Sequence, residues 1–355
     1  MKLTPGADTP AVEAAIRRVV ERGWFVLGPE LEAFEREFAA ACGSPFAAGT
    51  GTGTDALAIA LRALGIGPGD EVITTPLSAA YTALAIMMAG ARPVFADIDP
   101  VRLTLDPAAA AAAVGARSAA IVPVHLYGQP ADMAALTAVA ERHGLAIVED
   151  CCQAHLATCE GRTVGTFGAA AAYSFYPTKN LGALGDGGAL TTGDAAVADR
   201  ARRLRNGGQT SRYHHAEFGV NSRLDEIQAA VLRARLPLLP AWTAARRALA
   251  AAYRRELTGI PVLTVPPECD SGHVYHLFPV LAQARDRVMQ RLREAGIETL
   301  IHYPVPIPRQ PALAAADPRE CPIAGRICAE VLSLPLYPGL PTETAAAAAA
   351  ALRDS

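Results

Sequence analysis

The sequence predicts an α/β protein: a large domain with a mostly parallel sheet sandwiched by helices, followed by a smaller α+β C-terminal domain. Three observations support this prediction. Short apolar runs of strand length alternate with helical stretches over about two thirds of the chain, which is typical of a parallel sheet covered on both faces. A long helical pattern then leads to Pro237 and Pro240, a plausible hinge. A chain of 355 residues is also long for a single core.

The expected elements follow in chain order. Apolar periodicity predicts amphipathic helices over 12–20 and 30–41, and a third helix over 56–64. Apolar runs predict strands over 71–75, 93–96, 119–124, 146–148 and 169–175. A helix over 224–239 closes the large domain, and the small domain contains a strand over 274–281 and a helix over 286–295. We therefore expect a large domain at 1–237, with its N-terminal helix packed near the small domain, and a small domain at 238–355.

Composition excludes several classes of protein. A formal net charge of −3 gives no basic field for nucleic acid. The alanine runs 108–113 and 345–351 are too short to span a bilayer, and residues 1–9 lack the apolar core of a signal peptide. Seven cysteines without a C-x-x-C pair indicate neither a zinc site nor a disulfide framework. We expect a soluble, cytoplasmic protein with no nucleic acid, membrane or metal partner.

Lys179 is the most informative residue. It follows a strand-like run that ends at Pro177, and it precedes a turn with several glycines, residues 182–188. A desolvated lysine can lose its proton and form a Schiff base with an aldehyde. Taken alone, the pattern fits a surface lysine that follows a buried strand slightly better than it fits a Schiff-base lysine.

A second segment changes that balance. Asp150 ends the apolar run 145–148, and carboxylates at the carboxyl ends of parallel strands lie where α/β proteins bind ligands. Pyridoxal phosphate needs such an acid to keep its pyridine nitrogen protonated. The alternative is that Asp150 caps a following helix.

A third segment, residues 51–55, opens the helix expected over 56–64. Its small residues would expose backbone N–H groups to a phosphate. The segment also fits a loose dinucleotide fingerprint, but the next strand ends in Thr74-Thr75-Pro76 and not in the acid that binds a ribose. The dehydrogenase interpretation is therefore weak. A phosphate cradle, an acid and a lysine in this order indicate a pyridoxal phosphate enzyme.

With these motifs the chain resembles the DegT/StrS type of nucleotide-sugar aminotransferases, which use pyridoxal 5'-phosphate and have the aspartate-aminotransferase fold (fold type I). The resemblance runs from about Trp24 to the end of the chain. It rests on ordered blocks at 24–29, 67–73, 90–95, 124–130, 149–150, 174–182, 219–225 and 332–338.

The resemblance implies roles around the cofactor ring. Lys179 forms the Schiff base and later moves the proton between cofactor and sugar carbon. Asp150 pairs with the pyridinium nitrogen, and Gln153 lies against the ring near its phenolic oxygen.

It also implies how the cofactor phosphate is bound. Gly53 and Thr54 supply backbone donors, and the Ser174 hydroxyl joins them. Asn221 matches a family asparagine that reaches the phosphate in the neighbouring subunit, which implies a homodimer with shared active sites. Considered singly, Ser174 is also explained as a core serine and Asn221 as a turn residue.

Several positions depart from the family pattern. The family usually carries a ring-stacking aromatic where Ala79 stands, and Tyr81, two residues on, is the candidate replacement. Leu156 replaces a family glycine. His302 and Tyr303 keep a family block and are candidates for the substrate site, although a lone histidine is more often structural. We expect His125 to be a structural residue at a strand end.

The resemblance implies an aminotransferase that moves an amino group from glutamate onto a keto-sugar nucleotide. Gln153 and the run 181–188 resemble enzymes that aminate 3-keto-6-deoxyhexoses. A 4-keto-sugar nucleotide and a cyclitol such as scyllo-inosose remain alternative acceptors. A sugar dehydratase of this fold would carry histidine at position 179. A catalytically silent regulator would not need the lysine, the aspartate and the phosphate loop.

Overall fold

The computed structural model describes residues 6–313 and 319–353. Its centre is a seven-stranded sheet of order β1-β9-β8-β5-β4-β2-β3. The last five strands in this order pair in parallel, while β9 is antiparallel to both β8 and β1. The strands are β1 Phe46–Thr50, β2 Glu71–Thr74, β3 Arg92–Phe95, β4 Ser118–Val122, β5 Ala146–Asp150, β8 Ala170–Ser174 and β9 Gly188–Thr192. The predicted α/β fold is confirmed.

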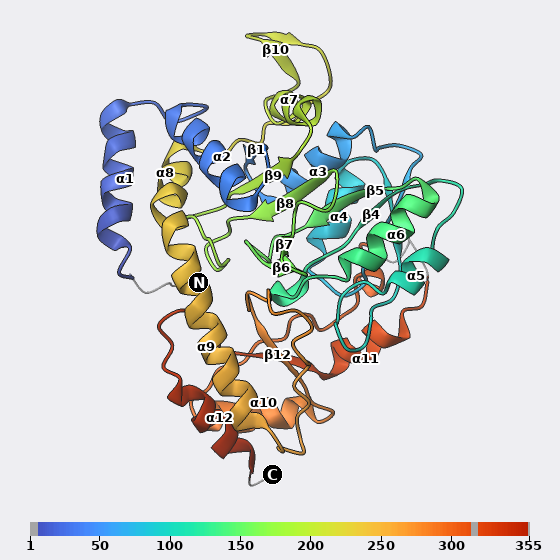
Figure 1. Cartoon of the computed structure of the whole chain (residues 1–355), viewed down its shortest axis with the longest axis vertical. Coiled ribbons are helices and arrows are strands. Elements are labelled where there is room, and N and C mark those ends of the chain that lie inside the picture. The colour runs from blue at the N-terminus through green and yellow to red at the C-terminus, as the bar shows by residue number, and fades with distance from the viewer. Residues whose placement is uncertain (1–5, 314–318, 354–355) are drawn as a thin grey trace.

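Helices cover both faces of the sheet (Figure 1). Alternate strand residues explain this: Ile73, Ile121 and Ile147 join one core cluster, and their neighbours Val72 and Val148 join another. The first cluster packs on α2 Pro29–Cys42, α5 Pro107–Ala112, α6 Met133–His143 and α8 Glu226–Arg235, and the second on α3 Gly53–Ala63, α4 Tyr81–Met88 and α7 Ala195–Leu204. The sheet is therefore buried between two layers of helices.

The second group of elements begins where α9 Leu239–Leu257 leaves the sheet (Figure 1). The antiparallel pair β12 Phe278–Leu281 and β13 Val331–Leu334 packs with α9, α10 Arg285–Glu294 and α12 Glu343–Arg353 around its own core. The helix α11 Pro322–Glu330 belongs to a cluster shared with the sheet side. We call these two groups the large and the small lobe.

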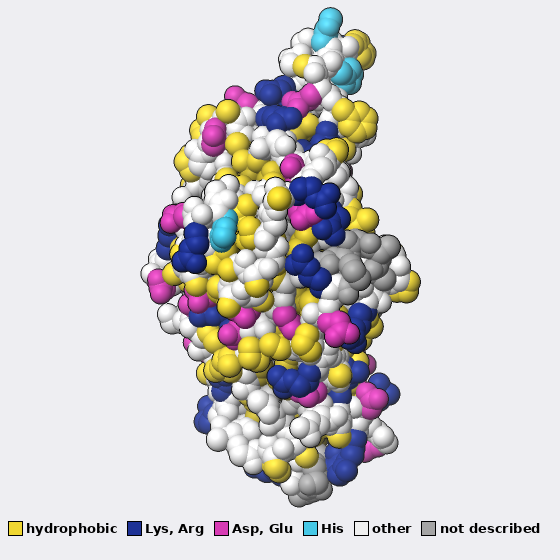
Figure 2. All heavy atoms as spheres, turned by 90° about the vertical axis from the view of Figure 1, so that its right-hand side faces the viewer, with side chains coloured by type: hydrophobic (Ala, Val, Ile, Leu, Met, Phe, Trp, Pro, Cys, Tyr) yellow, Lys and Arg dark blue, Asp and Glu magenta, His cyan; other side chains and the backbone are white. Residues whose placement is uncertain are grey.

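Two segments lie at the periphery of the large lobe. The helix α1 Thr9–Arg22 packs on α8, where Ala15 and Val19 bury against Ala230. The strands β10 Gln209–Ser211 and β11 His214–His215 form a projecting hairpin, and Figure 2 shows histidines near its end. Among the described helices, none is both long and apolar enough to cross a membrane.

Two sequence expectations need correction. The strand β1, at one edge of the sheet, and its neighbour β9 were not predicted, because their residues, 46–50 and 188–192, are rich in small residues with weak strand preference. The strand expected over 274–281 is confined to β12, and residues 273–277 are irregular.

Candidate active site

The predicted phosphate cradle lies at the start of α3, which leaves its first N–H groups without intrahelical partners. Thr52 caps the helix by accepting a hydrogen bond from the Asp55 N–H at 3.0 Å. Within the described residues, the Gly53 and Thr54 N–H groups donate no hydrogen bond. A Cβ atom on Gly53 would lie 2.7 Å from Cβ of Ser174 and 2.9 Å from Sγ of Cys152. Only glycine fits here, and two backbone donors remain available beside Ser174.

A second segment braces this loop. The Ser222 hydroxyl accepts from the Gly51 N–H at 2.9 Å and donates to Oδ2 of Asp55 at 2.7 Å. The preceding residue, Asn221, is exposed, and its side chain has no hydrogen bond among the described residues. Asn221 therefore lies next to the residue that braces segment 51–55 of its own chain, and no described residue occupies its side-chain amide.

Asp150 ends β5 and is nearly buried, at 6% exposure. Its Oδ2 accepts from the Thr82 hydroxyl at 2.8 Å, and its Oδ1 accepts from the Cys152 N–H at 3.1 Å. No helix begins within residues 151–157, so the alternative of a helix cap is wrong. Sequence reasoning missed Thr82, although a hydroxyl in the first turn of a helix that follows a strand was a usable signal.

Lys179 lies in the turn after β8, and its N–H bonds the Tyr176 carbonyl at 2.8 Å. Burial lowers the pKa of its amine, while the nearby Cys152 and Asp150 oppose that shift. The amine makes no hydrogen bond or ion pair with a described residue. Only one other lysine, Lys2, occurs in the sequence. Lys179 is therefore an unpaired amine near Asp150 whose burial favours the neutral form.

Gln153 joins the two lobes. Its Oε1 accepts from the Tyr127 N–H at 2.7 Å, and its Nε2 donates to the Tyr303 hydroxyl at 3.0 Å. Burial raises the pKa of Tyr303 to about 12; Gln153 opposes this, and Asp150 adds to it. The neutral phenol keeps its own proton available for a further acceptor.

The remaining substrate candidates lie around Tyr303. Tyr81 is the first residue of α4, is 65% exposed, and lies near enough to Tyr303 to affect its pKa. The carbonyl of His302 accepts from the Tyr127 hydroxyl, and its Nδ1 lies 3.0 Å from the Ser333 hydroxyl. Burial and the nearby Lys179 lower the pKa of His302. The structure thus brings Tyr303 and His302 close to Lys179 and Asp150, with Tyr81 at the margin.

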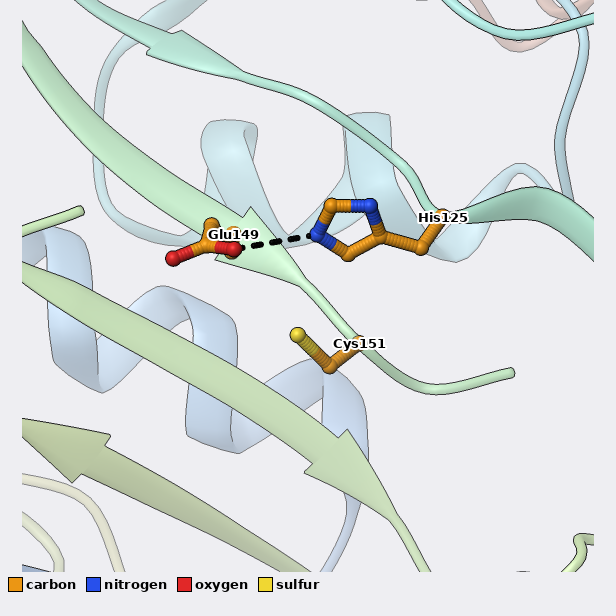
Figure 3. Close-up of side chains that lie close together, drawn as sticks. All are labelled: His125, Glu149 and Cys151. Carbon is orange, nitrogen blue, oxygen red and sulfur yellow. Dashed lines mark hydrogen bonds and ion pairs between the residues drawn. The ribbon is translucent and has the colours of Figure 1, made fainter. Parts of the chain in front are cut away.

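His125, Glu149 and Cys151, two of which flank Asp150 in the chain, form a fully buried cluster (Figure 3). His125 Nδ1 accepts from the Ala131 N–H at 3.0 Å, so its Nε2 carries the proton donated to Glu149 at 3.1 Å. Glu149 also accepts from three N–H groups of residues 165–168, at 2.6–2.8 Å. Burial raises the pKa of Cys151 well above its usual value, which disfavours a thiolate ligand. The cluster therefore serves structure, as expected for His125.

These groups fit pyridoxal phosphate, the cofactor that the resemblance implies. The free N–H groups and Ser174 suit its phosphate. Asp150 is fixed in orientation at a strand end, and Lys179 supplies an unpaired amine. The residues present can therefore hold the cofactor.

Known proteins resemble this chain over almost its whole length. The profile of the DegT/DnrJ/EryC1/StrS aminotransferase family matches residues 8–353. The dTDP-3-amino-3,4,6-trideoxy-alpha-D-glucose transaminase of Streptomyces venezuelae is 49% identical over 331 residues, covering 92% of this chain and 87% of its own. A pleiotropic regulatory protein of Geobacillus stearothermophilus is 46% identical over 340 residues, covering 94% of this chain and 91% of its own. The crystal structure of S. venezuelae DesV in complex with a ketimine intermediate matches with a TM-score of 0.94 and 48% identity, covering 98% of this chain and 94% of that one.

Proposed function

Since the chain belongs to the DegT/DnrJ/EryC1/StrS aminotransferase family, we propose that it moves an amino group from glutamate to C3 of a 3-keto-6-deoxyhexose nucleotide, with pyridoxal phosphate as its cofactor. The observation that carries the proposal is Lys179, whose amine has a lowered pKa, lies beside Asp150 and has no partner in the part of the chain that the structure describes. The 3-position is supported by the transaminase from S. venezuelae, whose name specifies a 3-amino sugar. The cytoplasm remains the proposed location.

Different residues of this chain would hold different parts of the cofactor. The N–H groups of Gly53 and Thr54 and the Ser174 hydroxyl would hold the cofactor phosphate. Asp150, oriented by Thr82 and the Cys152 N–H, would pair with the pyridine nitrogen. When bound, pyridoxal phosphate would supply the electron sink that makes removal of a proton from the substrate carbon possible.

We assign proton transfer to Lys179. Lys179 holds and moves the proton at its Nζ, because burial keeps the amine ready to lose its charge. Gln153, which donates a hydrogen bond to the Tyr303 hydroxyl, would lie near the phenolic oxygen of the cofactor. We assign Tyr303, His302 and Tyr81 to the part of the site that binds the sugar.

A substrate panel tests this proposal. The enzyme with its cofactor is mixed with glutamate and, separately, with 3-keto-sugar nucleotides, 4-keto-sugar nucleotides and scyllo-inosose, and 2-oxoglutarate and the amino product are measured. We expect turnover with a 3-keto-sugar nucleotide and none for Lys179→Ala. Preferred turnover of a 4-keto sugar or a cyclitol would refute the 3-position. No turnover with any acceptor would favour a regulatory role, which is the role that the name of the Geobacillus relative gives.

The proposal includes a homodimer in which Asn221 reaches the cofactor phosphate of the partner subunit. Three consecutive large apolar residues, Trp24, Phe25 and Val26, are exposed, and such a patch supports an interface. The Phe25 carbonyl accepts from the Glu226 N–H, which places this patch beside the segment after Asn221.

Mixed dimers test the shared sites. Asn221→Ala should remain folded and dimeric but lose cofactor on dialysis about tenfold faster, because a hydrogen bond to a charged phosphate contributes about 1.5–3 kcal/mol. A heterodimer of Asn221→Ala and Lys179→Ala subunits should contain one site with both defects and one with neither, and so recover activity. Absence of recovery in verified heterodimers would rule out the sharing.

A further inference from the structure

Residues 273–277, which we call the strap, cross from the small lobe to the large lobe without regular structure. The strap lies tightly on the turn at Leu126–Gly128. Its Val274 N–H donates to the Gly128 carbonyl at 3.0 Å, and its Leu277 N–H donates to the Tyr127 carbonyl at 3.3 Å. A Cβ atom on Gly128, whose φ is +92°, would lie 2.9 Å from the backbone nitrogen of His276. This close approach leaves the strap little freedom at that point.

The strap also bonds the residue that follows Lys179. Asn180 is 4% exposed, and its Nδ2 donates to the Val274 carbonyl at 3.0 Å. Its Oδ1 lies 3.1 Å from Nδ1 of His276. Because the amide nitrogen is already donating to a carbonyl, the amide oxygen must accept, so His276 carries its proton on Nδ1. His276 is also buried, and burial lowers its pKa well below its usual value. The hydrogen bond to Asn180 therefore comes from a neutral ring.

The small lobe holds the strap in shape. Arg246 of α9, nearly buried, donates to the carbonyls of Tyr275 and His276 at 3.2 Å each and to that of Leu336 at 3.0 Å. The His273 ring stacks on Tyr275 with centroids 3.9 Å apart, and its Nδ1 accepts from the Tyr275 N–H at 2.9 Å. The position of His276 is thus set from the small lobe.

We propose that His276 is a positioning residue for Lys179: through Asn180, the strap fixes the turn that carries the catalytic amine. The same strap bonds the backbone at Tyr127, whose N–H orients Gln153. One five-residue segment therefore sets the relative position of the amine and the amide that we assign to the cofactor. This inference rests on the proposed role of Lys179.

The test uses the full chain with Lys2→Arg, so that Lys179 is the only lysine. His276→Ala, Asn180→Ala and the double variant are compared by backbone hydrogen exchange of residues 179–183 in cofactor-free protein. The same proteins are titrated with pyridoxal phosphate, and the adduct that borohydride fixes on Lys179 is quantified by mass. We expect each single variant to exchange about tenfold faster in this segment and to need about tenfold more cofactor for half-maximal adduct. The double variant should be no worse than Asn180→Ala, since His276→Ala removes one of the two hydrogen bonds that Asn180→Ala removes.

Two variants serve as controls. His143→Ala changes an exposed histidine at the end of α6 and should match the parent protein. His276→Gln can still donate to Asn180 and should recover part of the loss, and it carries the comparison if His276→Ala does not fold. The inference would be overturned if His276→Ala showed the same hydrogen exchange and adduct formation as the parent protein. Additive losses in the double variant would also overturn it. Failure of the parent to form any adduct on Lys179 would instead refute the proposed function, while the exchange data on cofactor-free protein would still judge the strap.

Discussion

The Thr82 hydroxyl fixes one oxygen of Asp150 at 2.8 Å and is itself buried. Thr82→Val removes this hydrogen bond while keeping the shape of the side chain. Because a hydrogen bond to a charged group contributes about 1.5–3 kcal/mol, we expect the cofactor to bind about tenfold more weakly. The measurement is equilibrium dialysis with pyridoxal phosphate. Thr104→Val is the control, since that buried hydroxyl has no partner among the described residues. Equal affinities for the two variants would contradict the role of Thr82.

Leu156 stands where the family usually has glycine, and its φ of +58° explains that preference. Left-handed backbone costs a non-glycine residue about 1–2 kcal/mol. Leu156 also packs partly against the main core, so truncation loses contacts. We expect Leu156→Gly to be more stable than Leu156→Ala by about 1 kcal/mol, because both lose the side chain but only glycine relieves the backbone. Urea denaturation measures the difference, and a more stable alanine variant would show that the strain is absent.

Among single residues, those with distinctive chemistry were predictable from sequence. A lysine and an aspartate at strand ends stand out by type, and the structure places Lys179 and Asp150 close to each other. Asn180 and His276 were not predictable, because ordinary residue types acquire their role from partners 94 to 96 positions away. No local pattern encodes such contacts.

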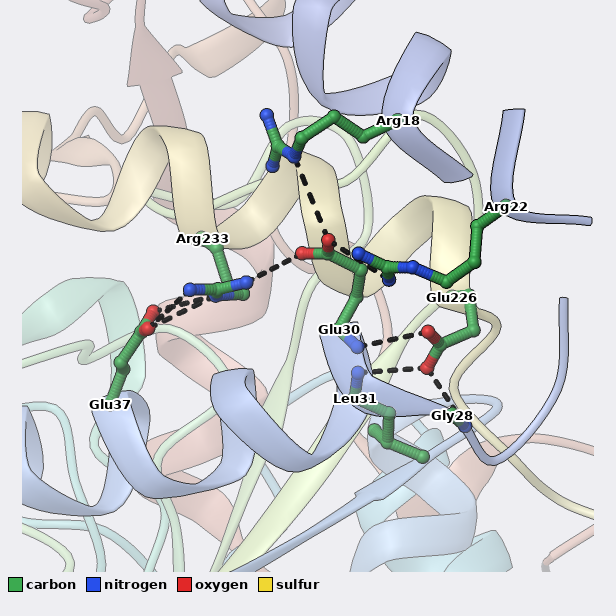
Figure 4. Close-up of polar contacts among 8 residues, drawn as sticks. All are labelled: Arg18, Arg22, Gly28, Glu30, Leu31, Glu37, Glu226 and Arg233. Carbon is green, nitrogen blue, oxygen red and sulfur yellow. Dashed lines mark hydrogen bonds and ion pairs between the residues drawn. The ribbon is translucent and has the colours of Figure 1, made fainter. Parts of the chain in front are cut away.

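The start of α2 depends on a carboxylate from α8 (Figure 4). Glu226 is fully buried and accepts from the N–H groups of Gly28, Glu30 and Leu31 at 2.8–3.0 Å. These are donors that a helix start leaves unpaired. Glu226→Ala should therefore lower the free energy of unfolding by about 3 kcal/mol, since an unsatisfied buried group costs about 1–3 kcal/mol.

Chemical denaturation of the variant checks this prediction. Glu32→Ala removes an exposed carboxylate from the same end of α2 and should change stability by less than about 0.5 kcal/mol. Similar losses in both variants would mean that general helix electrostatics, and not the cap by Glu226, stabilises this end.

At the level of elements, the parallel strands were predictable because each is a short apolar run between helices. The antiparallel strands β1 and β9 were not, because Gly49 and Gly188 fit through close packing: a Cβ on Gly188 would lie 2.3 Å from the Thr52 carbonyl oxygen. The strap was predicted as a strand because Val274 and Leu277 are apolar. Their N–H groups instead bond the turn at Leu126–Gly128, where the chain crosses between the lobes.

The whole molecule should lose stability in mild acid. His155 is fully buried between Tyr173 and Phe175, and neither ring nitrogen has a hydrogen-bond partner among the described residues. Burial lowers its pKa from 6.5 to about 3, and the same cause lowers that of His273 to about 3. Below pH 6.5 the unfolded chain binds protons that the native state does not. The stability that depends on these two neutral histidines is therefore fully present above pH 6.5. It falls as pH decreases towards 3, by about 1.4 kcal/mol per pH unit for each histidine.

His155→Phe tests this reasoning. The free energy of unfolding of cofactor-free protein is measured by urea denaturation between pH 6 and pH 4. The slope of the free energy of unfolding against pH should be smaller in the variant than in the parent, by the equivalent of about one bound proton. His143→Ala, which removes an exposed histidine, should have the same slope as the parent. An unchanged slope in His155→Phe would mean that His155 titrates normally in the folded state.

Lys179 is the amine that we expect to bind pyridoxal phosphate. In the Lys2→Arg protein, Lys179 is the only lysine. The most direct measurement adds pyridoxal phosphate, reduces with borohydride and locates the added mass by peptide mass spectrometry. We predict a visible absorption band that reduction abolishes and one adduct on the peptide containing Lys179, both absent from Lys179→Ala. An adduct of equal yield in Lys179→Ala, or an unmodified Lys179 in the folded protein, would contradict the account.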